Sequence, residues 1–396
     1  MRSLLGLWVL VFLGPGMLSA QNFKVVGYLP SYRFGVIDQI EFDKLTHLNI
    51  AFFNPDMEGN LNLPAGDFLP VLEKAQQGNL EVFISLAGGY LQADWEKAWN
   101  HLMRPENRSA FIHKIVQFSL THQFHGVDVD LEWQYVNDLY SPFVLELGDS
   151  LRANGLQMTA ASPGTYRYPQ ISSAALAAFD WVNMMVYDLT GPWAPNNPGP
   201  HSPIYFAEQA ISYWQNQGVP ASQLTLGVPF YGYDFTDRNN IRAYTYSTIL
   251  NRNLENAYRD QDGQIYYNGI PTIQIKTQMA MEQVSGIMIW EIGQDRFDHL
   301  SLLKTIDATI NGVSSTAGVL SRPQVLAYPN PFRENLYLQD LQTDELIQVF
   351  DQNGKVLIRS MMRAGEPVPF SNTWPVGMYV INFPTGNYPS IKVLKQ

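Results

Sequence analysis

The sequence predicts an α/β chain: a (β/α)8 TIM barrel followed by a small all-β, sandwich-like C-terminal domain. Short, nearly continuous apolar segments alternate with amphipathic segments up to about residue 311, and beyond it only short strands and turns follow. Parallel strands that are covered by helices read as continuous apolar runs. Eight such β–α units match the usual size of a TIM barrel.

The barrel elements follow from this alternation. The predicted strands cover residues 24–28, 45–53, 81–86, 126–131, 157–161, 181–187, 224–228 and 286–290. Helices are predicted over 67–76, 110–122, 141–153, 204–215 and 273–283, and the helix after the eighth strand ends near Asn311. The longer connection 231–268 contains Asp262-Gly263, which is typical of a hairpin turn. It is too short for a full inserted domain, which predicts a shallow, open groove.

The chain divides into four predicted parts. Residues 1–20 indicate a signal peptide, with Arg2 before an apolar stretch and the small Ala20 at its end. An uncleaved anchor is the alternative, but the apolar run is short for crossing a membrane. The barrel covers 21–311, a linker covers 312–324, and the β domain covers 325–396. The β domain's predicted strands are 335–338, 346–350, 356–360, 377–383 and 390–394.

Composition limits the partners. The net charge is −11, which argues against nucleic acid or an anionic membrane as partner and suits a neutral polymer. The chain has no Cys, so its stability depends on the core even if the protein is exported. We expect a monomer without a cofactor or metal: His122 and His125 are poorly spaced for zinc, and residues 260–263 lack the remaining ligands of a calcium loop.

The fourth predicted strand carries the chemistry. Side chains alternate along a strand, so Asp128, Asp130 and Glu132 share one face, with successive carboxylates roughly 6.6 Å apart. Burying charge without partners is costly, and neighbouring carboxylates raise one another's pKa, so at least one must hold a proton near neutral pH. A protonated carboxyl beside an ionised one is what glycoside hydrolysis needs. A solvated edge strand is the alternative, but no alternating polar strand lies beside it in the sequence.

Residues 24–310 resemble glycoside hydrolase family 18, the chitinase family. The family signature Asp-x-x-Asp-x-Asp-x-Glu is matched by residues 125–132 in its last three acids, whereas His125 stands at the first acidic position. Further similar motifs end other strands: 85–89 on the third, 185–188 with 191–193 on the sixth, and 289–291 on the eighth. Strict alternation puts His125 opposite the catalytic face, so we expect a modest effect on activity.

The resemblance implies a retaining, substrate-assisted reaction with Glu132 as general acid/base. The N-acetyl oxygen of the substrate would attack the anomeric carbon, and Asp130 would hold the acetamido N–H and stabilise the oxazolinium ion. Asp128 would share a proton with Asp130, and Tyr187 would donate its hydroxyl to the acetamido oxygen.

The resemblance also implies a sugar-binding surface. Trp290 would form the floor beneath the sugar that is cleaved, because flat aromatic faces suit sugar C–H surfaces. The other predicted substrate-binding residues are Asp188, Met185, Gly88, Gly89, Trp193, Tyr28 and Tyr231. Trp133 and Trp95 are further candidate sugar platforms. Tyr231 stands where many relatives carry Arg. Ordinary core packing is the alternative for the aromatic residues, and Asp188 could instead cap the next turn.

The C-terminal module resembles the sorting domain of the Bacteroidetes type IX secretion pathway. The similar segments are 328–332, 351–356 and 377–379, and a basic strand, 391–395, closes the chain. The resemblance implies the secretion machinery as a partner and a secreted or cell-surface location. A carbohydrate-binding sandwich is the alternative, although only Trp374 and a few Tyr could form its sugar platform.

The sequence therefore predicts a secreted endo-acting hydrolase of β-1,4-linked N-acetylglucosamine polymers, that is, a chitinase that binds chitin or related oligosaccharides. An endo-β-N-acetylglucosaminidase acting on glycoprotein or cell-wall glycans would use the same acids. A third interpretation is a non-catalytic chitin-binding lectin, which the presence of Glu132 disfavours.

Overall fold

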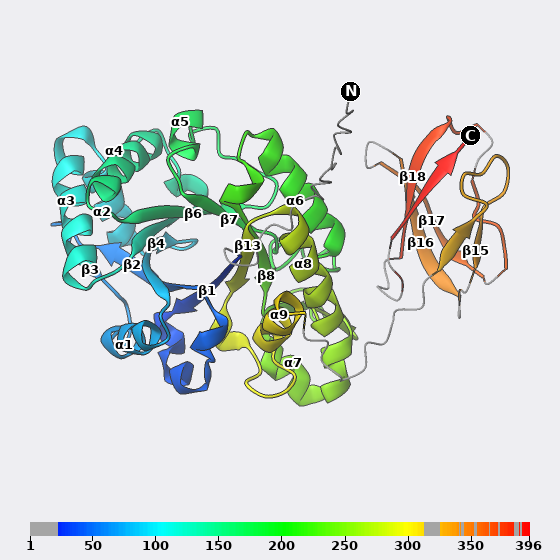
Figure 1. Ribbon diagram of the computed structural model, residues 1–396, viewed down its shortest axis with the longest axis horizontal. Coiled ribbons are helices and arrows are strands. Elements are labelled where there is room, and N and C mark those ends of the chain that lie inside the picture. Colours follow the sequence, from blue (N-terminus) through cyan, green and yellow to red (C-terminus); the bar gives the residue numbers. More distant parts are fainter. Residues whose placement is uncertain are drawn as a thin grey trace, which may run out of the picture. The chain divides into compact units, whose positions relative to one another are not determined.

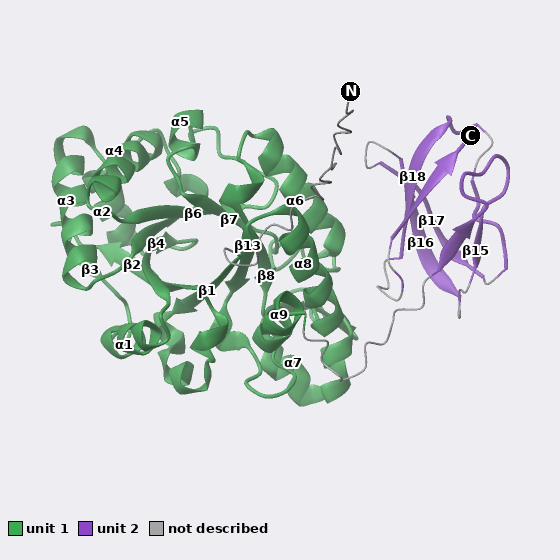
Figure 2. Cartoon of the chain, viewed as in Figure 1, with its two compact units in different colours: residues 1–312 green, residues 313–396 purple. Residues whose placement is uncertain are grey.

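The computed structural model describes residues 23–312, 325–339, 341, 344–351, 355–363, 365–370, 373–383, 388 and 390–396. The chain forms two compact units that divide after Gly312 (Figure 2). The expected signal peptide, 1–20, and nearly all of the expected linker, 312–324, lie outside the described residues.

Eight parallel strands close into the predicted barrel (Figure 1). They are β1 (Lys24–Pro30), β2 (His47–Pro55), β4 (Glu81–Gly88), β5 (Gly126–Leu131), β6 (Gln157–Pro163), β7 (Trp181–Met185), β8 (Leu224–Pro229) and β13 (Gly286–Trp290). Their order is β1-β13-β8-β7-β6-β5-β4-β2, and pairing of β1 with β2 closes the ring. All eight predicted strands are confirmed, and a short β3 (Leu61–Asn62) pairs antiparallel with β2.

Helices connect the strands around the outside of the ring (Figure 1). They are α1 (Leu69–Gln77), α2 (Ala93–Leu102), α3 (Pro105–Thr121), α4 (Tyr140–Ala153), α5 (Ser173–Leu176), α6 (Ile204–Asn216), α7 (Tyr246–Arg252), α8 (Ile270–Gln283) and α9 (Leu302–Ile310). The predicted helices are confirmed. The helices α2, α5 and α7 were not predicted: α5 and α7 are short, and in α2 polar residues outnumber the buried Ala98, Trp99 and Leu102.

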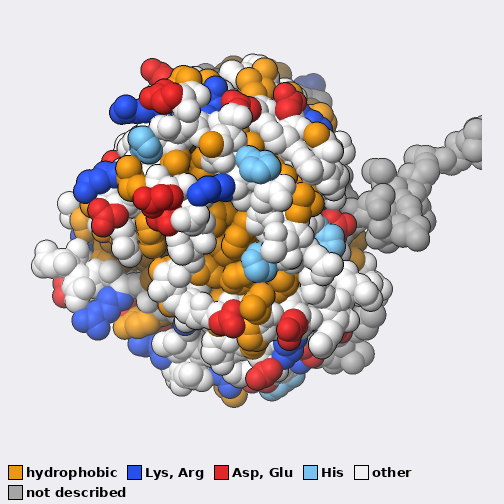
Figure 3. Space-filling view, turned by 90° about the vertical axis from the view of Figure 1, so that its left-hand side faces the viewer, with side chains coloured by type: hydrophobic (Ala, Val, Ile, Leu, Met, Phe, Trp, Pro, Cys, Tyr) orange, Lys and Arg blue, Asp and Glu red, His pale blue; other side chains and the backbone are white. Residues whose placement is uncertain are grey.

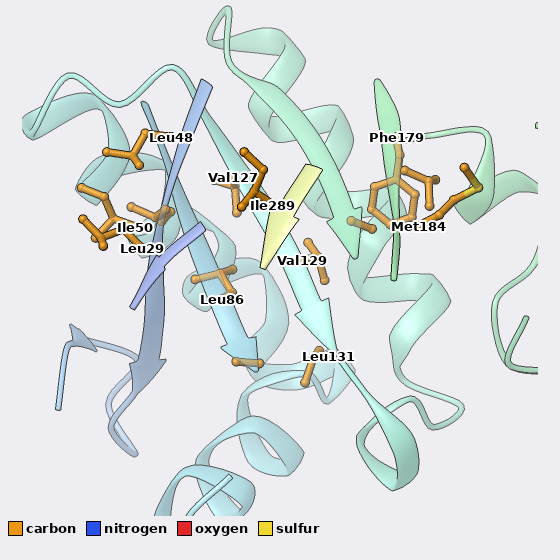
Figure 4. Packing of buried hydrophobic residues seen from close by; sticks show 14 of the residues in the cluster. Leu29, Leu48, Ile50, Leu86, Val127, Val129, Leu131, Phe179, Met184 and Ile289 are labelled. Atoms are coloured by element: carbon orange, nitrogen blue, oxygen red, sulfur yellow. The ribbon is translucent and has the colours of Figure 1, made fainter. Parts of the chain in front are cut away.

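The alternation in β5 is as predicted. Val127, Val129 and Leu131 point to one side of the strand, into the apolar layer under the helices (Figure 4). Asp128 and Asp130 therefore point to the other side, into the barrel, where both are buried. The register of one strand thus places two carboxyl groups inside the ring.

The connection after β8 is more structured than the sequence predicted. It holds a four-stranded sheet, β10-β9-β12-β11, and the helix α7. The strands are β9 (Tyr231–Asp234), β10 (Arg242–Thr245), β11 (Gln261–Asp262) and β12 (Ile265–Tyr266). The predicted turn at Asp262-Gly263 is confirmed, with Gly263 at φ 61°. The strands of two to four residues are too short to show a period of two in the sequence.

The second unit is all-β, as predicted. One sheet pairs β14 (Leu326–Tyr328) with β15 (Tyr337–Gln339), and the other has the order β17-β16-β18-β19. The strands of this sheet are β16 (Glu345–Phe350), β17 (Val356–Met362), β18 (Gly377–Asn382) and β19 (Ile391–Lys395). Trp374 stacks on Tyr379 with ring centroids 5.6 Å apart, so its indole packs within the unit and does not stand free as a platform.

The surface carries both signs of charge. On the face shown in Figure 3, acidic and basic side chains surround a central band of hydrophobic ones. Within the described part of the chain, no helix is long and apolar enough to cross a membrane.

Candidate active site

A cleft of about 890 Å³ opens at the carboxyl ends of the barrel strands. This is the end at which TIM barrels place their active sites. Ten of the predicted catalytic or substrate-binding residues line it: Tyr28, Gly88, Gly89, Asp130, Glu132, Met185, Tyr187, Asp188, Trp193 and Trp290. Of the other two, Asp128 lies beneath the cleft and Tyr231 lies behind Asp188.

Asp128 is held by four donors from four strands. Oδ2 accepts from the hydroxyls of Tyr28 at 2.8 Å and Ser85 at 2.7 Å. Oδ1 accepts from Thr159 Oγ1 at 2.6 Å and Asn183 Nδ2 at 3.3 Å. Burial raises the pKa of Asp128, and these hydrogen bonds oppose the rise. Asp128 is thus a fixed group that ties the strands together below the cleft.

Asp130 has a different environment. Its Oδ1 is buried without a hydrogen-bond partner in the described structure. Burial and then the carboxylates of Glu132 and Asp128 raise the pKa of Asp130 well above its usual range. The expected proton sharing with Asp128 is not formed through this oxygen, because four other donors already occupy Asp128. Asp130 thus lines the cleft with one carboxylate oxygen that has no partner among the described residues.

Glu132 immediately follows β5 and lines the cleft. Burial, and then the charge of Asp188, raises the pKa of Glu132 to about 7. A carboxyl group with this pKa is poised to give up a proton and take it back near neutral pH.

Gly89 makes room for the acid. A Cβ added there would lie 2.6 Å from Glu132 Oε1. We expect Gly89→Ala to displace the Glu132 carboxyl and to lower kcat about 100-fold, the order of loss caused by a misplaced group. Steady-state kinetics on an N-acetylglucosamine oligosaccharide checks this. Gly35→Ala is the control, because a Cβ at Gly35 meets nothing within 4 Å, and equal activity of the two variants would contradict the prediction.

Asp188 follows β7 and forms part of the cleft wall. It accepts from the hydroxyls of Tyr231 and Tyr233, the latter at 3.0 Å. Its backbone has a left-handed φ of 62°. Tyr231 therefore orients Asp188 and is not among the residues that line the cleft.

Aromatic side chains form the cleft floor and rim. Trp290 stacks on Phe52 with ring centroids 5.5 Å apart and meets Tyr28 edge-on at 5.8 Å. Aromatic residues along the rim are largely exposed, namely Tyr32, Tyr90, Trp133 and Trp193. Flat apolar faces beside polar groups are what sugar rings require.

Comparison of the sequence with known protein families agrees with this geometry. A model of the family described as "Glycosyl hydrolases family 18" matches residues 24–295. The chain belongs to glycosyl hydrolases family 18. The matched residues are a chitinase-like glycosidase domain and contain the cleft acids.

The chain is similar to solved and curated proteins that are named chitinases. The family 18 chitinase ChiB from the chitin utilization locus of Flavobacterium johnsoniae is 44% identical, with a TM-score of 0.72, over 74% of this chain and 95% of that chain. Probable chitinase 10 of Drosophila melanogaster is 29% identical over 52% of this chain and 10% of its own length. The endochitinase of Manduca sexta is 26% identical over 64% of this chain and 52% of its own length. The chain thus spans about a tenth and about half of the length of these two curated relatives.

Four cleft residues of this family 18 domain were not predicted, namely Tyr32, Phe52, Tyr90 and Ala161. Two of them could have been predicted from their positions in the sequence: Phe52 lies near the end of a barrel strand, and Tyr90 directly follows the Gly88-Gly89 pair. Trp95, an aromatic residue of α2, does not line the cleft.

His125 lies away from the acids, as alternation predicts. It is exposed just before β5, and its Nδ1 accepts from the Val82 N–H at 3.0 Å.

Among the residues that the structure describes, no cluster of three or more His, Asp or Glu side chains is arranged to hold a metal ion. At 260–263, Asp260 accepts from Gly269 and Thr272, and Asp262 pairs with Arg252.

Proposed function

We propose that this protein is a secreted, retaining, endo-acting chitinase that cleaves β-1,4-linked N-acetylglucosamine polymers. The observation that carries the proposal is the pairing of Glu132, with its pKa near 7, and the buried, unpartnered Asp130 Oδ1 in one cleft over Trp290. The similarity to relatives that are named chitinases supports the substrate class.

In the proposed reaction Glu132 protonates the glycosidic oxygen as the bond to the anomeric carbon breaks. Of the other carboxyl groups described at the cleft, Asp128 is enclosed by its four donors and Asp188 by two tyrosines, and we assign Asp130 to the acetamido N–H and not to attack on the anomeric carbon. The acetamido oxygen of the substrate therefore attacks the anomeric carbon, as in the substrate-assisted exceptions to the two-carboxylate scheme. Asp130 accepts the acetamido N–H, which positions the group and stabilises the resulting cation.

Glu132 then acts as the base. It removes a proton from the water molecule that opens the oxazolinium ion, and this proton restores the acid form of Glu132. Two displacements at the same carbon retain the configuration. Tyr187, whose hydroxyl has only a long contact to Met288 Sδ at 3.8 Å in the described structure, is free to donate to the acetamido oxygen.

The shape of the cleft supports internal cleavage. Tyr90, Trp193, Trp133 and Tyr32 are 79%, 58%, 61% and 64% exposed, so the rim is open and lined with aromatic faces. An open groove accepts the middle of a polymer, whereas a closed tunnel requires a chain end.

The test is hydrolysis of N-acetylchitohexaose, followed by mass spectrometry of the products and by NMR of the first anomer released. Internal fragments with the β anomer first are expected. Intact hexamer would refute the chitinase. Release of glycan from a glycoprotein in a parallel assay would then favour an endo-β-N-acetylglucosaminidase, and binding of the hexamer without turnover would favour a lectin.

We also propose that the C-terminal unit is a type IX sorting domain and that the protein reaches the cell surface or the medium as a monomer. The supporting observations are the all-β fold and the similar segments at 328–332 and 377–379. Deleting 325–396 in a host with this pathway is expected to stop export, which fractionation detects. Normal export of the shortened chain would refute the proposal.

A further inference from the structure

A buried polar cluster lies behind the cleft wall that carries Tyr187 and Asp188. It consists of His201, Ser202, Asn268 and Lys276, and is called the Lys276 cluster here. Each of its four residues is at most 3% exposed. The reaction proposed above uses none of them. Burying an ammonium group costs free energy, so its position next to the active site calls for a physical explanation.

All three N–H bonds of Lys276 have acceptors. The ammonium donates to Ser202 O at 2.6 Å, to Ser202 Oγ at 2.6 Å and to Asn268 Oδ1 at 2.8 Å. Asn268 in turn donates to Ser202 O at 3.0 Å. Burial lowers the pKa of Lys276 to about 7. In its protonated form the ammonium group has three donors and no acceptor, so this arrangement uses its full capacity. Lys276 therefore fixes both the backbone and the side chain of Ser202.

Ser202 in turn holds the backbone directly after β7. With its oxygen accepting from Lys276, the Ser202 hydroxyl donates its own proton to the Val186 carbonyl. Val186 directly precedes Tyr187. On the other side of Tyr187, the Asp188 N–H donates to His201 Nδ1 at 3.4 Å, and Leu189 N–H donates to His201 O at 2.9 Å. The backbone is thus held on both sides of Tyr187.

His201 completes the cluster. Its Nδ1 lies 3.4 Å from the Asp188 backbone N and 3.5 Å from Asp188 Oδ1, and its Nε2 lies 3.2 Å from Tyr231 O. The hydroxyl of the same Tyr231 donates to the Asp188 carboxylate. His201 therefore joins the two segments that place Asp188.

Tyr187 needs this support because its own side chain has little. Within the described structure its hydroxyl donates to Met288 Sδ at 3.8 Å, and sulfur is a weak acceptor. The hydroxyl position is therefore set by the backbone and by ring packing against Tyr231 at 6.2 Å. A misplacement of about 1 Å can cost about 100-fold in rate, so small shifts of this backbone matter.

We propose that Lys276 is a positioning residue of the reaction, which fixes Tyr187 and Asp188 in the cleft through Ser202 and Val186. The inference rests on the proposed function, because that function assigns Tyr187 to the substrate's acetamido group and places Asp188 beside the acid Glu132. It adds a buried amine on α8 that does not touch the substrate.

The test compares two deletions of a buried serine hydroxyl. Ser202→Ala removes the link from Lys276 to Val186. Ser119→Ala is the matched control, because Ser119 is equally buried and donates to the Ile115 carbonyl within α3. Steady-state kinetics on N-acetylchitohexaose is measured well below the unfolding midpoint of each variant. We expect Ser202→Ala to lower kcat at least about tenfold with KM within about twofold, and Ser119→Ala to change neither.

A second variant removes the amine. Lys276→Met keeps the length of the side chain and is expected to lower kcat further. If this variant does not fold, the comparison of Ser202→Ala with Ser119→Ala tests the inference by itself. Equal kcat values for Ser202→Ala and Ser119→Ala, with an active wild type, would overturn the inference and leave the proposed function standing. A rise in KM alone would also overturn it. An inactive wild type would instead refute the proposed function and the inference together.

Discussion

Replacing Glu132 by Gln is expected to lower kcat on N-acetylchitohexaose by roughly 10²–10⁴-fold, the usual contribution of a positioned general acid. The amide has nearly the shape of the carboxyl group and fits the space that Gly89 leaves, but it cannot donate a proton to the leaving oxygen. The floor of Trp290 and Phe52 is unchanged, so binding is expected to persist. Product analysis gives the rate, and isothermal titration calorimetry gives the affinity.

The same carboxyl group sets the alkaline limit of activity. Its pKa is raised to about 7, first by burial and then by Asp188, so the acid form dominates below pH 7 and is lost above it. We expect kcat of the wild type to fall as the pH rises through about 7. Gly35→Ala serves as the control, with an unchanged profile. A constant kcat between pH 5 and 9, or turnover by the Gln variant at the wild-type rate, would remove Glu132 from the mechanism.

The sequence predicted the barrel because its strands are buried on both faces and therefore read as apolar runs. It also predicted the direction of Asp128 and Asp130, since the alternation in β5 leaves only one arrangement with Val127 and Val129 under the helices. The small sheet after β8 was not predictable in this way. Its elements are held by pairing with one another, and four residues or fewer show no reliable period.

Most of the residues that line the cleft could be predicted from the sequence, but the contacts that support them could not. The partners of Asp128 are Tyr28, Ser85, Thr159 and Asn183, between 31 and 100 residues away in the sequence. Lys276 reads as an ordinary solvated lysine of an amphipathic helix, and only the packing of α8 shows that it is buried. Such contacts depend on which strands and helices meet in space, and one sequence does not encode that in any local pattern.

Replacing Arg33 by Met is expected to destabilise the barrel by about 3–5 kcal/mol at pH 8, the cost of leaving a buried charge without its partner. Arg33 Nε donates to Glu291 Oε1 at 2.8 Å, and the Glu291 side chain is fully buried. Glu291 also accepts from the Gly293 N–H at Oε2, 2.8 Å away, and from the Gln294 side chain. Methionine keeps the apolar stem that packs on Gly293 but removes the cation. Urea unfolding, followed by circular dichroism, measures the change.

The loss is expected to be smaller at pH 5 than at pH 8. Burial raises the pKa of Glu291 and Arg33 lowers it, so the pKa rises further when Arg33 is removed. A raised folded-state pKa gives stability at low pH that is lost as the pH rises through it. Lys74→Met is the control, because Lys74 pairs with the 92% exposed Asp38, and such a surface pair contributes at most about 1 kcal/mol.

The position of this ion pair explains why its loss would reach the active site. Arg33 lies in the segment after β1, and Glu291 directly follows Trp290 at the end of β13, so the pair spans the seam where the first and last strands meet. Arg33 also lies over the ring of the cleft residue Tyr32, 5.6 Å from its centroid. A loss of stability equal at both pH values would show that Glu291 is not ionised in the native state. The seam would then be held by packing and not by charge.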